Sequence, residues 1–214
     1  GTSRLLGIEL LRNFAYPYFS RDIAEFWRRW HISLSSWFRD YLYIPLGGSK
    51  GGIWRSIRNT FIIFLVSGFW HGANWTFIAW GALNAIYFLP LMLLKRNRSN
   101  LDIVAHGRIF PSVKETIGMI VTFTLTVFAW IFFRAETVSD AISYIGRIFS
   151  PTLLSVPEAI STETIPLFVC LVLFMTVEWL QRNKKHGLQI DGVFPSRIVR
   201  WNFYIMLSFL IYYV

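Results

Sequence analysis

The sequence predicts an all-α protein, a multi-pass bundle of transmembrane helices with one amphipathic helix that lies in the membrane interface. Composition is the first observation. Of the 214 residues, 54% are hydrophobic and only 15% are charged, whereas an average soluble domain has about 25% charged residues. The second observation is that apolar residues form long runs, with most Lys and Arg residues in the segments between them. The third is a segment in which aromatic and charged residues alternate with helical spacing.

That segment, residues 20–44, is predicted to be the interfacial helix. At about 100° per residue, its large apolar side chains fall on one face and its charged and serine side chains on the other. The apolar face holds Ile23, Trp27, Trp30, Leu34, Trp37, Phe38 and Tyr41, and the polar face holds Arg21, Glu25, Arg28, Ser35, Ser36 and Arg39. Ser20 is a suitable N-cap, and Pro45 with the glycines after it ends the helix. A helix with aromatic residues opposite arginines lies in the interface rather than across the bilayer.

The remaining elements are predicted to be membrane helices within one partial membrane domain, residues 1–214. They are a hairpin at residues 59–94 and single helices at 115–134, 164–181 and 201–214. A spanning helix needs about 20 residues. The first apolar run of the hairpin begins at Phe61 and reaches that length only if it continues to about Trp75.

Loop charges predict the orientation of these helices. Cytoplasmic loops carry an excess of Lys and Arg, and basic loops alternate here with loops that are not basic. The basic regions are 50–58, 95–114 and 182–200, and we expect these to face the cytoplasm. This placement explains the net charge of +9 without a nucleic-acid partner. The single cysteine, Cys170, excludes an internal disulfide and lies in an apolar run, where a packing role is expected.

An ionisable residue, His71, interrupts the apolar stretch Phe64–Trp80. Such residues are costly inside a membrane and usually face a protein interior or a watery cavity. Burial favours the neutral imidazole, which can accept a proton as a general base. Trp70 and Trp75 flank it, and Asn74 offers an amide that can donate to a developing oxyanion. The plainer alternative is a histidine that hydrogen-bonds a carbonyl at a helix turn.

Other polar residues give weaker signals by themselves. His31 lies beside Trp30 at the edge of the aromatic face, where a purely structural interfacial role is the alternative. Arg39 can bind a lipid phosphate or an anionic substrate, or simply form part of a solvated basic face. The sequence contains no metal-ligand cluster, no phosphate-binding glycine loop and no nucleophile elbow.

Three motifs resemble the membrane-bound O-acyltransferase family. They are EFWRRWHISLSSWFRDYLYIPLGG (Glu25–Gly48), SGFWHGANWTFIAWG (Ser67–Gly81) and FAWIFFRAETVSDAISYI (Phe128–Ile145). The nearest likeness is to the bacterial polysaccharide branch, typified by alginate O-acetyltransferase. The resemblance covers about the C-terminal half of a typical member. We therefore expect this chain alone to be inactive and to need the missing N-terminal half of the same protein.

The resemblance also implies a reaction and residue roles. His71 matches the invariant histidine of the family, taken as the catalytic base, and His31 matches a second histidine along the same tunnel. Candidate substrate or tunnel residues are Asn74, Trp70, Trp75, Trp30 and Arg39. An acyl group, acetyl in this branch, would pass from acetyl-CoA or another cytoplasmic thioester to hydroxyls of an exported, alginate-like polysaccharide. The implied setting is the bacterial inner membrane, in contact with lipid, with periplasmic acetyltransferase partner proteins and no metal.

Two other classes of protein stay open. In a transport or channel component, His71 would line a path rather than catalyse. Inverted-repeat transporters have paired broken helices, whereas the sequence indicates one such break. A proton path would favour more intramembrane carboxylates, and the sequence offers only Glu178, near a helix end where it can reach the interface. In the remaining alternative, the chain is an inactive scaffold that recruits a periplasmic partner.

Overall fold

The computed structural model describes residues 2–150, 164–187, 189 and 196–213. All regular structure in these residues is helical, which confirms the predicted all-α class. The chain divides into two compact units, Gly1–Thr164 and Ile165–Val214. The first begins with two short elements, α1 (Thr2–Leu5) and the 3₁₀ turn η1 (Pro17–Phe19).

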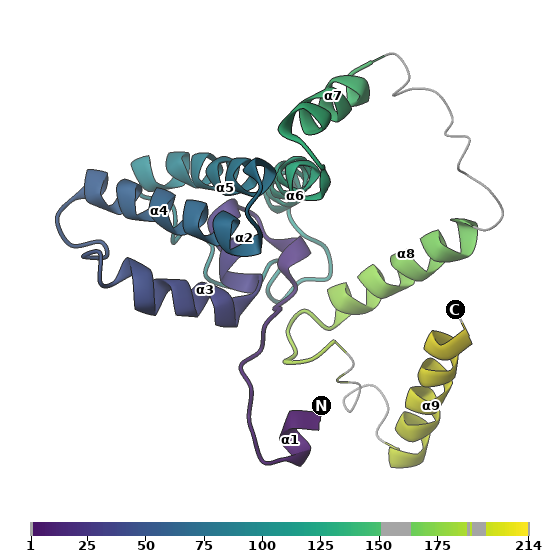
Figure 1. Ribbon diagram of the computed structural model, residues 1–214. Helices are drawn as coiled ribbons and strands as arrows, with labels where there is room; N and C mark the ends of the chain where they lie inside the picture. The colour runs from purple at the N-terminus through teal and green to yellow at the C-terminus, as the bar shows by residue number, and fades with distance from the viewer. Residues whose placement is uncertain (1, 151–163, 188, 190–195, 214) are drawn as a thin grey trace. The chain divides into compact units, whose positions relative to one another are not determined.

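An antiparallel helical hairpin forms the centre of the first unit. Its arms, α4 (Ile53–His71) and α5 (Trp75–Leu93), lie side by side (Figure 1). Gly68 and Gly81 allow this close approach. A Cβ atom on Gly68 would collide with the carbonyl oxygen of Phe77, and one on Gly81 with that of Phe64. The region predicted as a membrane hairpin, residues 59–94, contains most of α4 and all of α5, and α4 begins at Ile53.

A third long helix, α6 (Val113–Arg134), packs against α5 and leads into α7 (Val138–Ile148). A capping box begins α6. The Ser112 hydroxyl accepts a hydrogen bond from the Glu115 amide, and the Glu115 carboxylate accepts one from the Ser112 amide. With 19 and 22 residues, α5 and α6 are long and apolar enough to cross a membrane.

The segment predicted as one amphipathic helix, residues 20–44, is broken. It consists of α2 (Ile23–Arg29), α3 (Ile32–Phe38) and the π-helical turn η2 (Arg39–Tyr43). The prediction of Ser20 as N-cap is wrong, because the Asp22 side chain caps α2 through the Glu25 amide at 2.7 Å. The break follows from the left-handed backbone of His31, whose φ of 45° cannot continue a helix.

Helix α2 is also more buried than an interfacial helix with one solvated face. Ile23, Ala24, Glu25 and Phe26 are all buried, and Glu25 is only 1% exposed. The helical projection placed Glu25 on the polar face, but its carboxylate lies among protein cations, with Arg21 at 3.0 Å and Arg29 at 2.8 Å. A projection cannot separate solvent from buried counter-charges, because either one accommodates a carboxylate. Where α2 and α3 lie relative to a membrane stays a prediction.

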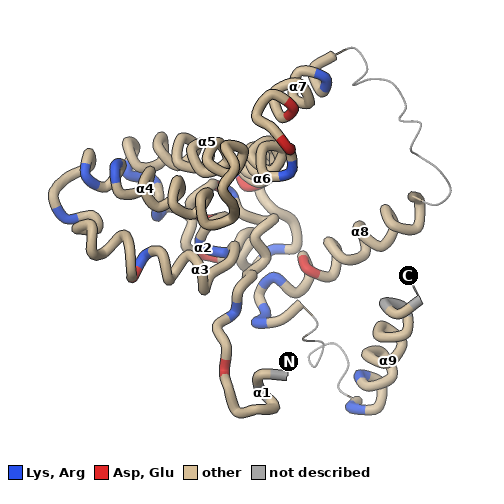
Figure 2. The backbone as a smooth tube through the Cα atoms, in the orientation of Figure 1, with Lys and Arg blue, Asp and Glu red and all other residues tan. Residues whose placement is uncertain are grey.

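Basic residues gather at one end of the α4–α5 hairpin (Figure 2). Lys50 and Arg55 lie where α4 begins, and Lys95, Arg96 and Arg98 follow the end of α5. The turn that joins α4 to α5 carries no Lys or Arg. This arrangement gives the hairpin one basic end and one end without basic residues, as the predicted orientation requires.

The second unit contains α8 (Thr164–Leu180) and α9 (Arg197–Tyr213). Helix α8 is apolar but, at 17 residues, shorter than α5 and α6. It corresponds to the helix predicted at 164–181, and α9 begins somewhat before the predicted residue 201. No residue of α8 is buried within the described part of the chain. An apolar surface of this extent is expected to meet lipid or other protein.

Candidate functional site: a cavity with two histidines

A cavity of about 700 Å³ lies in the first unit, between the hairpin, α2, α3 and α6. His71 and Trp80 line it near the turn of the hairpin, and Met92 lines it near the other end of α5. Twelve helical residues separate Trp80 from Met92, which corresponds to about 18 Å. The cavity is therefore elongated along the hairpin, from the turn with His71 toward the basic loops that hold Ser49 and Arg98.

His71 is the last residue of α4, and aromatic rings surround its partly buried side chain. Its ring centroid lies 5.3 Å from that of Trp80 and 5.0 Å from that of Phe133. Of the two tryptophans that flank it in sequence, Trp70 touches its ring at 4.9 Å. Trp70 and Trp75 are nevertheless 58% and 78% exposed, and neither lines the cavity.

The rings that enclose His71 inside the cavity come from other helices. Trp80 belongs to α5, and Phe133 belongs to α6. Both occur in the motifs quoted above, but their residue types alone do not distinguish them from ordinary packing. Only the tertiary arrangement brings them to the histidine.

Asn74 has a different place from the one its nearness to His71 suggested. Its side-chain oxygen accepts a hydrogen bond from the Thr76 amide at 3.1 Å and so caps α5. Its side-chain nitrogen donates to the carbonyl of Glu136 at 3.0 Å, which ties this turn to the segment after α6. Asn74 does not line the cavity. The structure thus gives its amide two structural partners outside the cavity.

His31 lines the same cavity from the break between α2 and α3. It is a non-glycine residue in the left-handed region, a conformation that costs roughly 1–2 kcal/mol. Strain of this kind persists only where the surrounding structure enforces it, and it occurs often at functional sites. The Nδ1 atom of His31 is buried and has no hydrogen-bond partner among the described residues. Both histidines predicted from the sequence thus lie on one cavity.

A residue that sequence reasoning missed holds the start of α3. The main-chain oxygen of Asn13 accepts a hydrogen bond from the Ile32 amide at 2.9 Å. Its side-chain Oδ1 accepts from the Ser33 amide at 3.1 Å and from the Ser33 hydroxyl at 2.6 Å. His31 occupies the N-cap position but makes no side-chain cap hydrogen bond. A cap supplied from a distant segment leaves no local sequence signal, so only the structure reveals it.

Trp30 and Arg39, the other predicted tunnel residues, both line the cavity. The Trp30 ring stacks on Phe26, with 5.5 Å between ring centroids, and touches Trp130 at 5.3 Å. Arg39 begins the π-helical turn and pairs with Asp40 at 2.7 Å. Single π-helical turns occur frequently at functional sites.

Two further arginines line the end of the cavity near the basic loops. The Arg28 guanidinium donates to the carbonyl oxygens of Asn97 and Asn100, at 2.8 and 2.7 Å, and so ties the loop after α5 to α2. Arg98 belongs to that loop, and its side chain has no ion pair or hydrogen bond with the described residues. Among the described residues that line the cavity, Arg98 is therefore an arginine whose guanidinium is available to an anion.

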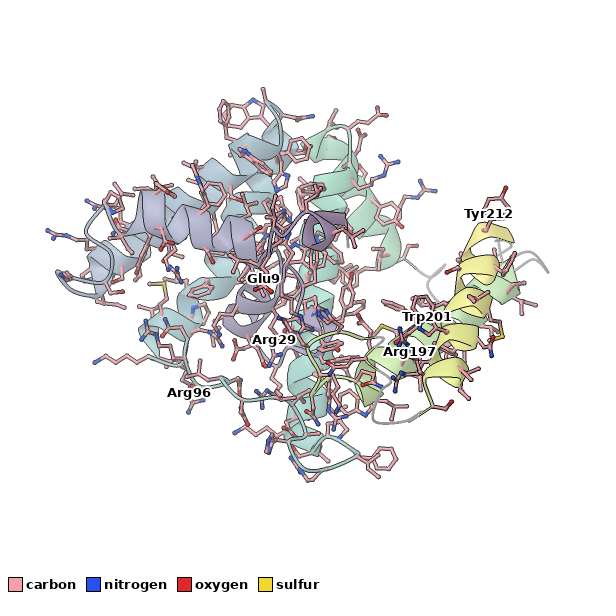
Figure 3. The ribbon with its side chains drawn as sticks, turned by 90° about the horizontal axis from the view of Figure 1, so that it is seen from below. Glu9, Arg29, Arg96, Arg197, Trp201 and Tyr212 are labelled. Atoms are coloured by element: carbon pink, nitrogen blue, oxygen red, sulfur yellow. The ribbon has the colours of Figure 1, made fainter. Side chains whose placement is uncertain are left out.

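An ion-pair cluster also holds the loop after α5 in place. Arg21 lies 3.0 Å from Glu25, 2.9 Å from Asp102 and 3.5 Å from Glu115. The hydrogen bond from Arg21 lowers the pKa of Asp102, so this carboxylate is charged at neutral pH. Arg29 completes the cluster through its ion pair with Glu25 and lies in the middle of the first unit (Figure 3). Arg96, in contrast, projects from the edge of the unit in the same view.

The helices and the cavity define a class: a helical membrane protein with two histidines on one cavity that is rich in aromatic side chains. Comparison with known proteins identifies the family. The profile of the MBOAT, membrane-bound O-acyltransferase family, matches residues 3–132, more than half of the chain. The chain belongs to this family.

Several curated proteins are similar to the chain. "Probable alginate O-acetylase AlgI" of Pseudomonas aeruginosa is 41% identical over 150 residues, 70% of this chain and 27% of that protein. "Peptidoglycan O-acetyltransferase" of Helicobacter pylori is 32% identical over 207 residues, 88% of this chain and 38% of that protein. "Teichoic acid D-alanyltransferase" of Streptococcus thermophilus is 35% identical over 144 residues, 61% of this chain and 34% of that protein. The chain thus matches well under half the length of each relative, and their names differ in acyl group and polymer.

Proposed function

We propose that the whole protein that carries this chain is a bacterial inner-membrane O-acetyltransferase acting on an exported polysaccharide, with an alginate-like polymer as the first candidate. One observation carries the proposal. A single elongated cavity is lined by His71 and His31 and also by three arginines, Arg28, Arg39 and Arg98. A base and an anion-binding end on one cavity suit the transfer of an acyl group from a charged donor.

The acceptor hydroxyl is activated by His71. The neutral imidazole takes the hydroxyl proton while the oxygen attacks the thioester carbonyl carbon. A new carbon–oxygen bond forms, the carbon–sulfur bond breaks, and the departing thiolate takes the proton back from the imidazolium. A positioned general base contributes about 10²- to 10⁴-fold in rate. The rings of Trp80 and Phe133 beside His71 keep water from hydrolysing the thioester.

The donor enters at the basic end of the cavity. The charge pattern assigns that end to the cytoplasm, where acetyl-CoA and other acyl thioesters are found. Arg98 and Arg28 offer guanidinium groups to the phosphates of such a donor. The thioester then lies along the apolar middle of the cavity and reaches toward the histidines, with His31 as the second polar contact for the reacting groups.

The acceptor approaches from the opposite side. His71 is at the end of the hairpin that lacks basic residues, which the same charge pattern assigns to the outer face. Periplasmic acetyltransferase partner proteins would carry the acetyl group from there to the polymer. Surrounding lipid would cover the exposed apolar faces of α5 and α6.

Replacement of the base tests the proposal. His71→Ala in the full-length gene should reduce the incorporation of labelled acetate into alkali-labile ester by at least about 100-fold. Immunoblots match the amounts of protein in the membrane, and isolation of the labelled polymer identifies the acceptor. His106→Ala is the matched control, because His106 is an exposed loop histidine that does not line the cavity. Unchanged incorporation in His71→Ala would refute the proposal.

A further inference from the structure

We propose that Asn13 is a positioning residue for His31: it holds the left-handed backbone that directs the imidazole to the cavity. The inference rests on the proposed function, in which His31 contacts the reacting groups. It assigns a role to the segment before η1, which lies outside the three motifs quoted in the sequence analysis.

Among the described residues, no hydrogen bond to the His31 ring fixes its position. Histidine rings at functional sites are commonly oriented by a hydrogen bond to one ring nitrogen. Here Nδ1 is buried without a partner among the described residues. The ring direction therefore depends on the backbone at residue 31 and on packing, and that backbone is in a conformation that L-residues rarely adopt.

Asn13 bonds to both residues that follow His31. Its main-chain oxygen binds the Ile32 amide, and its side-chain oxygen binds the amide and hydroxyl of Ser33. These bonds take up N–H groups at the start of α3 that would otherwise lack partners. They also fix where α3 starts, and thus which residue occupies the break between the helices.

The two residues after Asn13 hold the chain on the other side of His31. The Ala15 amide donates to the carbonyl of Arg29 at 2.9 Å, and the Arg29 guanidinium donates to the carbonyl of Ala15 at 3.2 Å. The Phe14 ring packs near the imidazole, with 6.0 Å between ring centroids. The chain is thus held on both sides of His31 by one short segment. Within that segment, Asn13 contributes the side-chain hydrogen bonds to α3 that are seen among the described residues.

A double-mutant cycle on the acetylation rate tests this role. Asn13→Ala should slow acetylation by about 10- to 100-fold, because small displacements of a reacting group are costly. Asn13→Asp keeps the acceptor oxygen and should restore most of the rate. In a His31→Gln background, Asn13→Ala should add less than about a twofold loss, since two residues that act as a unit are not additive. Equal losses in both backgrounds would overturn the proposal.

Asn100→Ala is the matched control. Asn100 also joins distant segments at a helix start, donating to the Asp22 carboxylate at 2.6 Å, but it does not contact the start of α3. Asn100→Ala should reduce the acetylation rate by the same factor with His31 and with Gln at position 31. A measurable loss caused by Asn100→Ala in the His31→Gln background also demonstrates that a further loss of rate can be detected there.

A second measurement does not depend on activity. In a Cys170→Ser background, His31→Cys places the only thiol of the described chain on the cavity. Asn13→Ala should change its rate of reaction with a small maleimide several-fold, and Asn100→Ala should not. An unchanged rate with Asn13→Ala would overturn the positioning role. Full acetylation by His31→Gln would instead refute the proposed role of His31. The His71→Ala experiment tests the proposed function independently, so the two failures can be distinguished.

Discussion

At the scale of single residues, the two histidines of the cavity are held in different ways. His71 ends a long helix and is enclosed by rings from α5 and α6, so its position follows from the packing of the bundle. His31 lies at the break between α2 and α3, and its position follows from the hydrogen bonds of the segment that contains Asn13. His71 could be predicted as functional from its surroundings, because an ionisable residue among apolar ones needs a reason to be there, whereas the prediction for His31 came from the family resemblance. Asn13 could not be predicted, because its role exists only once two distant segments meet.

The free arginine of the cavity gives a prediction for donor binding. Arg98→Gln should raise the acetyl-CoA concentration for half-maximal acetylation by about fivefold, since an exposed charge pair contributes on the order of 1 kcal/mol. The maximal rate should change little, because Arg98 lies in the loop at the basic end of the cavity, opposite the end with His71. Rates in membrane vesicles of the full-length protein, over a range of acetyl-CoA concentrations, measure both quantities.

Arg96→Gln is the control for this experiment. Arg96 is exposed in the same loop but does not line the cavity, so its removal changes the loop charge by the same amount without touching the proposed phosphate contact. Equal effects of the two changes would mean that the loop acts through general charge and that Arg98 has no specific contact.

At the scale of elements, the long apolar helices could be predicted from the sequence, whereas the break in the amphipathic segment, residues 20–44, could not. Apolar periodicity and length predict α5 and α6 because both depend on the local chain. The same periodicity continues across Trp30–His31, so a helical projection of residues 20–44 shows no break there. The structure interrupts the helix because Asn13 caps a new one at Ile32, and tertiary hydrogen bonds override the local pattern.

The close packing of α4 against α5 gives a prediction for stability. Gly68→Ala should lower the melting temperature of the purified full-length protein, because the added Cβ collides with the main chain of Phe77, which cannot move aside as a side chain would. Overpacking of this kind costs about 1–3 kcal/mol. A melting curve in detergent, followed by intrinsic tryptophan fluorescence, measures the shift.

Gly146→Ala provides the opposite case within the same protein. Gly146 lies inside α7, and a Cβ atom there would have no neighbour within 4 Å. Alanine should therefore stabilise that helix by about 0.5–1 kcal/mol through its better helix propensity. If Gly68→Ala left the melting temperature unchanged or raised it, as Gly146→Ala should, close packing at Gly68 would not limit the hairpin.

At the scale of the whole molecule, the cavity has a direction. It extends from a hairpin turn without Lys or Arg to loops rich in them, and Figure 2 shows the basic residues at that end of the hairpin. If the predicted orientation and the proposed function hold, a cytoplasmic donor meets the basic end and an outer acceptor the other, so that neither has to cross the membrane completely. The sequence predicts this orientation, but the alignment of the cavity with it becomes visible only in the fold.

Cysteine labelling tests the direction. In a Cys170→Ser background, Ser139→Cys in α7 should react with a membrane-impermeant maleimide in spheroplasts, because α7 follows the outer end of α6 in the predicted orientation. Ser99→Cys, in the basic loop after α5, should react only after the membrane is opened, because positive loops stay in the cytoplasm. Both serines are exposed, so access to the reagent depends on the side of the membrane and not on burial. The reverse pattern would place Arg98 outside the cell, where no acetyl-CoA is available, and the proposed path of the donor would then be wrong.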